Sequence, residues 1–319
     1  MDSVGVDFLP VDVYCFLGKE VRVRSNSEAI LAHLRSMYGR FYDGPDIDPK
    51  TRRMHWEEVP GPGMQILDHL PERNELLIDD RNYLYRASQT NGRYYYTSRN
   101  LRTAADDLSG FCPPLTLIQS SLLRTIAVSA REHHFVHAGA VSWRENAVVF
   151  PAASGLGKTT LVLKLLSLGC KFLSDEVGCL DIEGAAIEPF PRKVNLRKES
   201  RLLLHLSGTK QENVPAQGEG PEQMLDIEEI SPASLSDRYP LRFIVFMRGF
   251  GDEPRLEYVS GSHAVFEFLN SSIGPINDPG LHLYKLAPTI NGARCFNLVM
   301  GELEETASLV MQLLDKQSL

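Results

Sequence analysis

The segment AASGLGKT, residues 152–159, has the residue types and the spacing of a loop that binds phosphate groups. Small residues allow backbone N–H groups to curl around phosphate oxygens. Lys158 would reach the outer phosphates, and the hydroxyl of Thr159 would bind Mg²⁺. The sequence predicts a site for ATP or a related nucleoside triphosphate with Mg²⁺. The residues predicted to bind the nucleotide are Ser154, Gly155, Leu156, Gly157, Lys158, Thr159 and Thr160.

The neighbouring segments favour this interpretation over a simple glycine turn between a strand and a helix. The apolar segment AVVF precedes the loop directly, and the leucine-rich segment KTTLVLKLLSLG follows it. A strand before such a loop and a helix after it are the context that a phosphate site needs, because the helix presents its positive end to the anion. Ala152 stands in the first position of the motif, where glycine is commoner.

Two carboxylates follow the predicted helix at a position suited to a kinase or ATPase. Asp175 and Glu176 separate two apolar segments of FLSDEVGCLDI, which we expect to be adjacent strands. Neighbouring residues on a strand point to opposite faces, so one of the two carboxylates is expected to face the nucleotide unless a bend intervenes. A metal ligand or a base is the expected role for such a carboxylate. The alternative is a solvated carboxylate in a turn.

A histidine lies one strand before the loop, in the segment FVHAGAV. Its position on a strand next to the loop would allow His137 to form hydrogen bonds near a transferred group. The alternative is that His137 is a packed histidine in an apolar strand, which is a common arrangement.

Composition and charge exclude several classes of protein. The formal net charge of -8 argues against an extended nucleic-acid interface, because such interfaces rely on clustered lysine and arginine. No apolar segment reaches the length of a membrane span, and the beginning of the chain lacks the pattern of a secretory signal. The five cysteines are odd in number and form no CxxC pair, as expected of reduced thiols. We therefore predict a cytoplasmic protein without membrane or nucleic-acid partners.

The pattern of elements predicts an α/β fold with two parts. Residues 1–110 contain short strands, a helix at SEAILAHLRSMYGRF and a hairpin at Asn91-Gly92, which predict a small α+β module. Residues 111–319 begin with a helix initiated by proline and continue through strand, loop, helix and strand, as in a βαβ core. The polar segment 207–222 is predicted to be a surface loop.

The segment VHAGAVSWRENAVVFPAASGLGKTTLVLKLLSLGCKFLSDEVGCLD resembles the catalytic core of the HPr kinase/phosphorylase superfamily. The resemblance covers residues 134–182 and implies a P-loop core related to phosphoenolpyruvate carboxykinase. It also implies phosphorylation of a seryl hydroxyl on a protein, with Asp175 as the base, His137 as a helper and Thr159 as a metal ligand. Glu176 belongs to the acidic pair of the family and would assist with the metal. The family is oligomeric, which implies a homo-oligomer.

The sequence departs from the family at several positions. Thr160 stands where the family often has an acidic residue, and the glycine-rich segment of bifunctional members is replaced by EPFPRKVNLRKES. In that segment Glu188 would be a second metal carboxylate and Arg192 would stabilise charge. Arg248, at the end of a predicted strand, could touch the transferred phosphate or be a surface charge. PFPRKVNL is similar to shorter HPr-kinase-like proteins of modified-peptide biosynthesis, some of which phosphorylate a precursor peptide.

Three functional hypotheses follow. The first is an ATP- and Mg²⁺-dependent kinase whose acceptor is a serine of a protein or a precursor peptide, with residues 1–110 as a module for the substrate or partner. The second is a nucleotide-binding regulator that transfers nothing. The third is a kinase for a free amino acid or a sugar. The presence of both His137 and Asp175 favours a kinase over a regulator, which has no need of the two together.

Overall fold

The computed structural model divides the chain into two compact units, residues 1–130 and residues 131–319. The ranges that the structure describes are 9–48, 54–69, 75–81, 83–90, 93–100, 106–111, 114–196, 200, 204, 223–232, 234–274 and 279–316. Residues 207–222, predicted to form a loop, and the turn at Asn91-Gly92 lie outside these ranges.

The first unit is built on one sheet with the strand order β3-β1-β2-β4-β5-β6-β7-β8. Its strands are β1 (Val11–Phe16), β2 (Lys19–Ser25), β3 (Tyr42–Pro45), β4 (Gly63–His69), β5 (Glu75–Asp79), β6 (Tyr83–Thr90), β7 (Arg93–Asn100) and β8 (Asp106–Phe111). Its helices are α1 (Glu28–Met37), the short 3₁₀ helix η1 (Trp56–Glu58) and α4 (Pro114–Ser129). The predicted strand hairpins β1–β2 and β6–β7 are both present as antiparallel pairs.

Helix α4 packs on β2, β4 and β5 and is part of the first unit. Its buried residues Leu117, Ile118, Leu122 and Ile126 recur at the spacing of one helical face. The division of the chain therefore falls at residues 130/131, whereas the sequence interpretation placed the helix in the second part. The proline at the start of this helix indicated where a helix begins. It did not indicate a boundary between units, because the helix packs on the sheet that precedes it.

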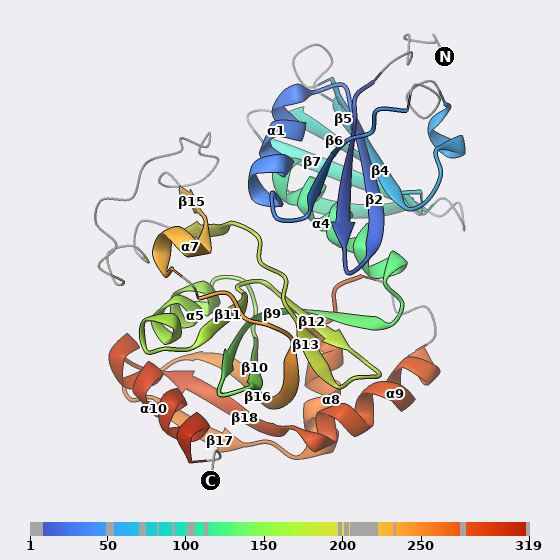
Figure 1. Ribbon diagram of the computed structural model, residues 1–319. Helices are drawn as coiled ribbons and strands as arrows, with labels where there is room; N and C mark the ends of the chain where they lie inside the picture. The colour runs from blue at the N-terminus through green and yellow to red at the C-terminus, as the bar shows by residue number, and fades with distance from the viewer. Residues whose placement is uncertain are drawn as a thin grey trace. The chain divides into compact units, whose positions relative to one another are not determined.

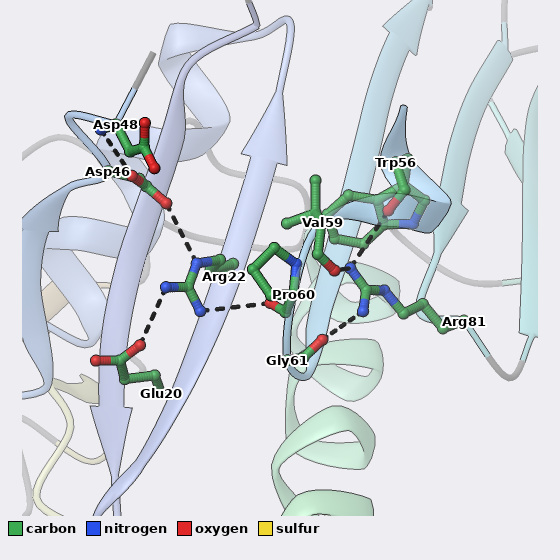
Figure 2. A network of polar contacts seen from close by, with 9 residues as sticks. All are labelled: Glu20, Arg22, Asp46, Asp48, Trp56, Val59, Pro60, Gly61 and Arg81. Atoms are coloured by element: carbon green, nitrogen blue, oxygen red, sulfur yellow. Dashed lines mark hydrogen bonds and ion pairs between the residues drawn. The ribbon is translucent and has the colours of Figure 1, made fainter. Parts of the chain in front are cut away.

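Two arginines hold the segment between β3 and β4 in place (Figure 2). The guanidinium of Arg81 donates hydrogen bonds to the carbonyl oxygens of Val59 and Trp56 at 2.6 and 3.3 Å, and it lies over the indole ring of Trp56. The guanidinium of Arg22 donates to the carbonyl of Pro60 at 3.4 Å. Carbonyl groups without partners in a sheet ladder need other donors, and these arginines supply them.

The second unit has three parallel strands, β10, β16 and β18, with antiparallel strands beside them. Its strands are β9 (His133–Trp143), β10 (Asn146–Pro151), β11 (Lys171–Ser174), β12 (Val177–Asp181), β13 (Ala186–Glu188), β14 (Val194–Leu196), β15 (Gln223–Leu225), β16 (Tyr239–Phe250), β17 (Arg255–Tyr258) and β18 (Arg294–Met300). Its helices are α5 (Lys158–Ser167), α7 (Ile227–Ile230), α8 (Gly261–Asn270), α9 (Pro279–Gly292) and α10 (Leu303–Asp315).

Helices cover both faces of this sheet (Figure 1). Along β10, Val148 and Phe150 belong to the apolar cluster formed with α5 and α10. The alternate residues Ala147 and Val149 belong to the cluster formed with α8 and α9. Successive side chains of a strand point to opposite faces, so an apolar run such as AVVF suits a strand that is buried on both sides. The second unit is thus a mixed α/β fold.

Strand β9 joins two parts of the sheet. Its first half, His133–His137, pairs with β12, and its second half, Ala138–Trp143, pairs with both β10 and β11. The break between the two halves falls at His137 and Ala138, where the strand meets both the end of β10 and the carboxylate pair. This geometry places the histidine of the HAG segment next to the beginning of the glycine loop.

The sequence interpretation differs from the structure in two elements of the second unit. β11 and β12 were expected to be adjacent strands, but each pairs with β9, and they follow one another along it. Helix α9 was not anticipated, because Pro288 lies inside it and proline usually ends a helix. No helix in the described part of the chain is both long and apolar enough to cross a membrane.

Candidate active site

The loop of residues 152–157 connects the end of β10 to the first turn of α5. Gly155 has a φ of 85° and Gly157 a φ of 77°, conformations that only glycine adopts at little cost. A Cβ on Gly155 would meet no protein atom within 4 Å, so the space above the loop is open to a ligand. The backbone N–H groups of the first helical turn have no carbonyl partners within the helix and favour an anion there. The loop has the form that a phosphate cradle requires.

Lys158 begins α5 and folds back over the loop. Its side chain is 7% exposed, and its Nζ donates hydrogen bonds to the carbonyl oxygens of Ala152 and Ala153 at 2.8 and 3.0 Å. The same Nζ lies 3.0 Å from Nε2 of His137. An ammonium group only donates, so Nε2 accepts and the imidazole is neutral, with its proton on Nδ1. The structure thus brings two predicted site residues into contact.

Burial and neighbouring charge set the protonation of this pair. Burial, together with the nearby cations of Lys158 and Arg192, lowers the pKa of His137 to about 4. Burial also lowers the pKa of Lys158 to about 8, against the opposing effect of the Asp175 carboxylate. His137 is therefore neutral above about pH 5, and Lys158 loses its charge near the upper end of the physiological range.

Asp175 lies at a bend between β11 and β12, and this bend allows both carboxylates to approach the same region. The hydroxyl of Ser174 accepts hydrogen bonds from the backbone N–H groups of Val177 and Glu176, at 3.0 and 3.4 Å, and so stabilises the bend. The sequence interpretation required such a bend and did not predict it. A serine directly before the acidic pair was the available signal, since serine hydroxyls often bond to nearby backbone groups in turns.

The carboxylate of Asp175 is 2% exposed and faces the beginning of α5. Its Oδ2 accepts a hydrogen bond from the hydroxyl of Thr159 at 3.4 Å, and its Oδ1 lies 3.6 Å from Nε of Arg192. Oδ1 accepts no hydrogen bond from any residue that the structure describes. Arg192 thus compensates the charge of this buried carboxylate, while Oδ1 can still accept a hydrogen bond from a further donor.

Arg192 connects the two carboxylates. Its side chain is 6% exposed, and its guanidinium pairs with Glu176 as well as with Asp175. A planar guanidinium can bond two carboxylates at fixed angles, so Arg192 both orients Asp175 and compensates its charge. The sequence prediction of Arg192 as a positive group near the site agrees with this position.

Two other predicted residues have partners elsewhere. Glu188 forms an ion pair with Arg238 at 3.2 Å, and Arg238 also pairs with Asp181. Arg248 pairs with Glu267 and donates to the side chain of Asn297. These contacts do not bring Glu188 to the loop or Arg248 to the carboxylate pair.

Thr160, the last residue of the predicted nucleotide set, donates a hydrogen bond to Ser200 at 2.9 Å. The two adjacent threonines therefore point to different partners, as successive residues on a helix do. Of the pair, Thr159 is the one that faces the carboxylate.

The residues around Thr159 fit a magnesium ion that is held mainly by a nucleotide. Mg²⁺ usually takes one or two protein oxygens, substrate phosphates and water, rather than a complete cage of side chains. No group of three or more histidine, cysteine or acidic side chains that could hold a metal occurs among the described residues. The hydroxyl of Thr159, bonded to Oδ2 of Asp175, and the Oδ1 that accepts no hydrogen bond from the described residues agree with a magnesium site of this kind.

Gly139, on β9, explains how α5 approaches the sheet so closely. A Cβ at this position would lie 2.7 Å from Cγ2 of Val162 and 3.9 Å from Cβ of Lys158. Any larger residue would push the helix, and with it Lys158, away from His137. The glycine of HAG thus has a packing function that sequence reasoning missed, although its place two residues after His137 was visible.

We expect Gly139→Ala to lower the free energy of unfolding by about 1–3 kcal/mol, the usual cost of overpacking. Thermal or urea unfolding would measure the loss. A double variant with Val162→Ala should recover part of it, because the clash is with the valine methyl group. Gly292→Ala is a suitable control, since its Cβ would meet no atom within 4 Å. A Gly139→Ala protein as stable as the parent would refute this account of the close packing.

The comparisons with known proteins found no match in sequence and a distant match in structure. No protein-family model and no curated protein matches the sequence. Among solved structures, a match is the structure of the Hpr(Ser) kinase/phosphatase from Coxiella burnetii, with a TM-score of 0.29 and 11% identity, over 58% of this chain and 98% of that chain. The relation is a distant structural one, so the roles of the site residues have to follow from their own contacts.

Proposed function

We propose that this protein is an ATP- and Mg²⁺-dependent kinase that transfers a phosphoryl group to a hydroxyl, most simply a serine of a protein or a precursor peptide. The observation that carries the proposal is the buried carboxylate of Asp175, held beside Thr159 at the start of α5. A carboxylate at this place can assist in holding Mg²⁺ or can act as a base. A kinase needs one to accept the proton of its acceptor.

In this proposal the acceptor oxygen attacks the γ-phosphorus of ATP, and its proton passes to Asp175. The bond between the γ-phosphorus and the bridging oxygen breaks, and ADP leaves. Lys158 and the N–H groups at the start of α5 stabilise the negative charge on the phosphates. Mg²⁺, when bound, supplies further positive charge to the phosphates, and Thr159 would hold it. The neutral imidazole of His137 positions Lys158 through their shared contact.

The choice of a serine acceptor rests on the sequence resemblance of residues 134–182 to serine kinases and of PFPRKVNL to peptide-modifying relatives. The first unit would then bind the peptide or protein that carries the serine. The direct test is incubation with ATP, Mg²⁺ and candidate peptides, followed by mass spectrometry for a phosphate adduct. Nucleotide binding without an adduct on any peptide or small hydroxyl compound would contradict the proposal and favour a regulator.

The lowered pKa of Lys158 predicts a pH-dependent affinity for the nucleotide. The free protein holds a charged lysine below about pH 8 and a neutral one above it. Bound phosphates favour the charged form, so binding above pH 8 must take up a proton, and the affinity falls as the pH rises. We expect the Kd for ATP to rise about tenfold between pH 7 and pH 9.

Calorimetry in two buffers that differ in their enthalpy of ionisation checks this prediction. Proton uptake on binding should be near zero at pH 6.5 and substantial at pH 8.5. The neutral His137, with a pKa of about 4, should make no contribution in this range. A Kd that is constant from pH 7 to pH 9 would mean that Lys158 does not contact the phosphates as a charged group.

A further inference from the structure

A cavity of about 410 Å³ lies in the second unit at the beginnings of β10 and β18 and near the beginning of β16. Three polar residues from these neighbouring strands line it, and so do three large apolar residues. They are Asn146, Arg242 and Arg294, and Trp143, Phe243 and Leu314. The glycine loop follows the other end of β10, after Pro151, so the cavity is a separate site from the one described above.

The strand register brings the two arginines together. β10 and β16 run parallel, with Val148 opposite Phe243, and β16 and β18 run parallel, with Phe243 opposite Arg294. Arg242 directly precedes Phe243 in the chain. Since the three strands are parallel neighbours, their first residues lie along one edge of the sheet. The cavity is therefore a product of the fold rather than of one surface loop.

The indole of Trp143 is a fixed wall of this cavity. Its Nε1 donates a hydrogen bond to the carboxylate of Asp315 at 3.2 Å, and the guanidinium of Arg144 lies 5.3 Å from its ring centre. Arg144 also pairs with Asp315 at 3.1 Å, which compensates that carboxylate. An aromatic ring held on two sides loses little entropy when a ligand packs against it.

The charge of the cavity is positive. Among the described residues that line it, the charged ones are Arg242 and Arg294. Arg294 lies over the ring of Phe296 at 5.7 Å, and no ion pair of either arginine with an acidic side chain occurs within the described part of the chain. Guanidinium groups bond carboxylates and phosphates through paired N–H donors. Two guanidinium groups beside apolar side chains suit an anion that carries an apolar part.

We propose that this cavity binds a small organic anion, a carboxylate or a phosphate monoester attached to an apolar ring. Arg242 and Arg294 would bind the anionic group, and Trp143 and Phe243 would pack against the ring. The proposal does not depend on the kinase function, because the residues of the two sites are different.

Tryptophan fluorescence gives a direct test, because the chain has two tryptophans, Trp56 and Trp143. A Trp56→Phe protein reports on the cavity alone. We expect benzoate or phenyl phosphate to change its fluorescence in a saturable way. Benzylamine and benzyl alcohol should not, since they lack the negative charge, and inorganic phosphate should bind more weakly because it lacks the ring. No saturable change with either anion, or equal binding of benzylamine, would overturn the proposal.

Variants identify the site of binding. Arg242→Gln and Arg294→Gln should each weaken binding of the anion about tenfold, as expected for the loss of a charged hydrogen bond. Circular dichroism should confirm that these exposed positions tolerate glutamine. Lys158→Met in the same background removes the lysine of the glycine loop and should leave the fluorescence titration unchanged. Binding that survives both arginine substitutions, or that is lost with Lys158→Met, would refute the assignment to this cavity.

Discussion

Asp175→Asn is expected to reduce phosphoryl transfer by about 10²–10⁴-fold, the usual contribution of a positioned base, with nucleotide binding largely retained. Asparagine has nearly the same shape as aspartate and can keep a hydrogen bond with Thr159, but it cannot accept the proton of the acceptor hydroxyl. Transfer measured by phosphopeptide mass spectrometry and binding measured by calorimetry would separate the two effects. Arg192 keeps Glu176 as an ionic partner in this variant, so the fold should survive.

Asp181→Asn is a matched control, because Asp181 ends the strand β12 that begins just after the carboxylate pair. The side chain of Asp181 pairs with Arg238, and none of its interactions described above is with the loop. The control should transfer at the parent rate. Full activity of Asp175→Asn would disprove the assignment of the base. Loss of nucleotide binding together with transfer would instead assign Asp175 to the nucleotide site and not to proton transfer.

The local pattern of the sequence was sufficient for most of the site. The apolar run AVVF and the leucine-rich segment after the loop predicted β10 and α5, and the glycines predicted the loop between them. His137 and Asp175 were predicted from their order around the loop. Their roles were implied by the resemblance to the HPr kinase/phosphorylase superfamily, because position alone left a packed histidine and a turn carboxylate as alternatives. The structure places His137 against Lys158 and Asp175 against Thr159.

Contacts between distant segments could not be predicted in the same way. The pairing of β11 and β12 along a single strand depends on the bend that Ser174 stabilises, and periodicity does not show which strand a segment joins. The ion-pair partner of Glu188 is Arg238, which lies far along the chain. Local periodicity does not show such a contact, so the sequence could not exclude Glu188 from the metal site. The membership of α4 in the first unit likewise depends on which sheet its apolar face meets.

Lys158→Met is expected to weaken ATP binding by about 10²-fold, because a charged hydrogen bond to phosphate is lost from a buried position. Methionine retains the apolar part of the side chain, so packing beneath the loop should persist. The backbone carbonyls of Ala152 and Ala153 and Nε2 of His137 would lose their donor. Some loss of stability, about 1–3 kcal/mol, should therefore accompany the loss of affinity.

Lys164→Met, on the same helix, provides the control, since Lys164 pairs with Glu304. It should bind ATP as the parent does. The pKa of His137 supplies a second measurement that does not depend on activity. Lys158 is one of the charges that lower this pKa, so NMR titration of Lys158→Met should show it raised from about 4 towards the ordinary value, while burial keeps it below 6.5. An unchanged pKa would mean that Lys158 and His137 are not in contact in solution.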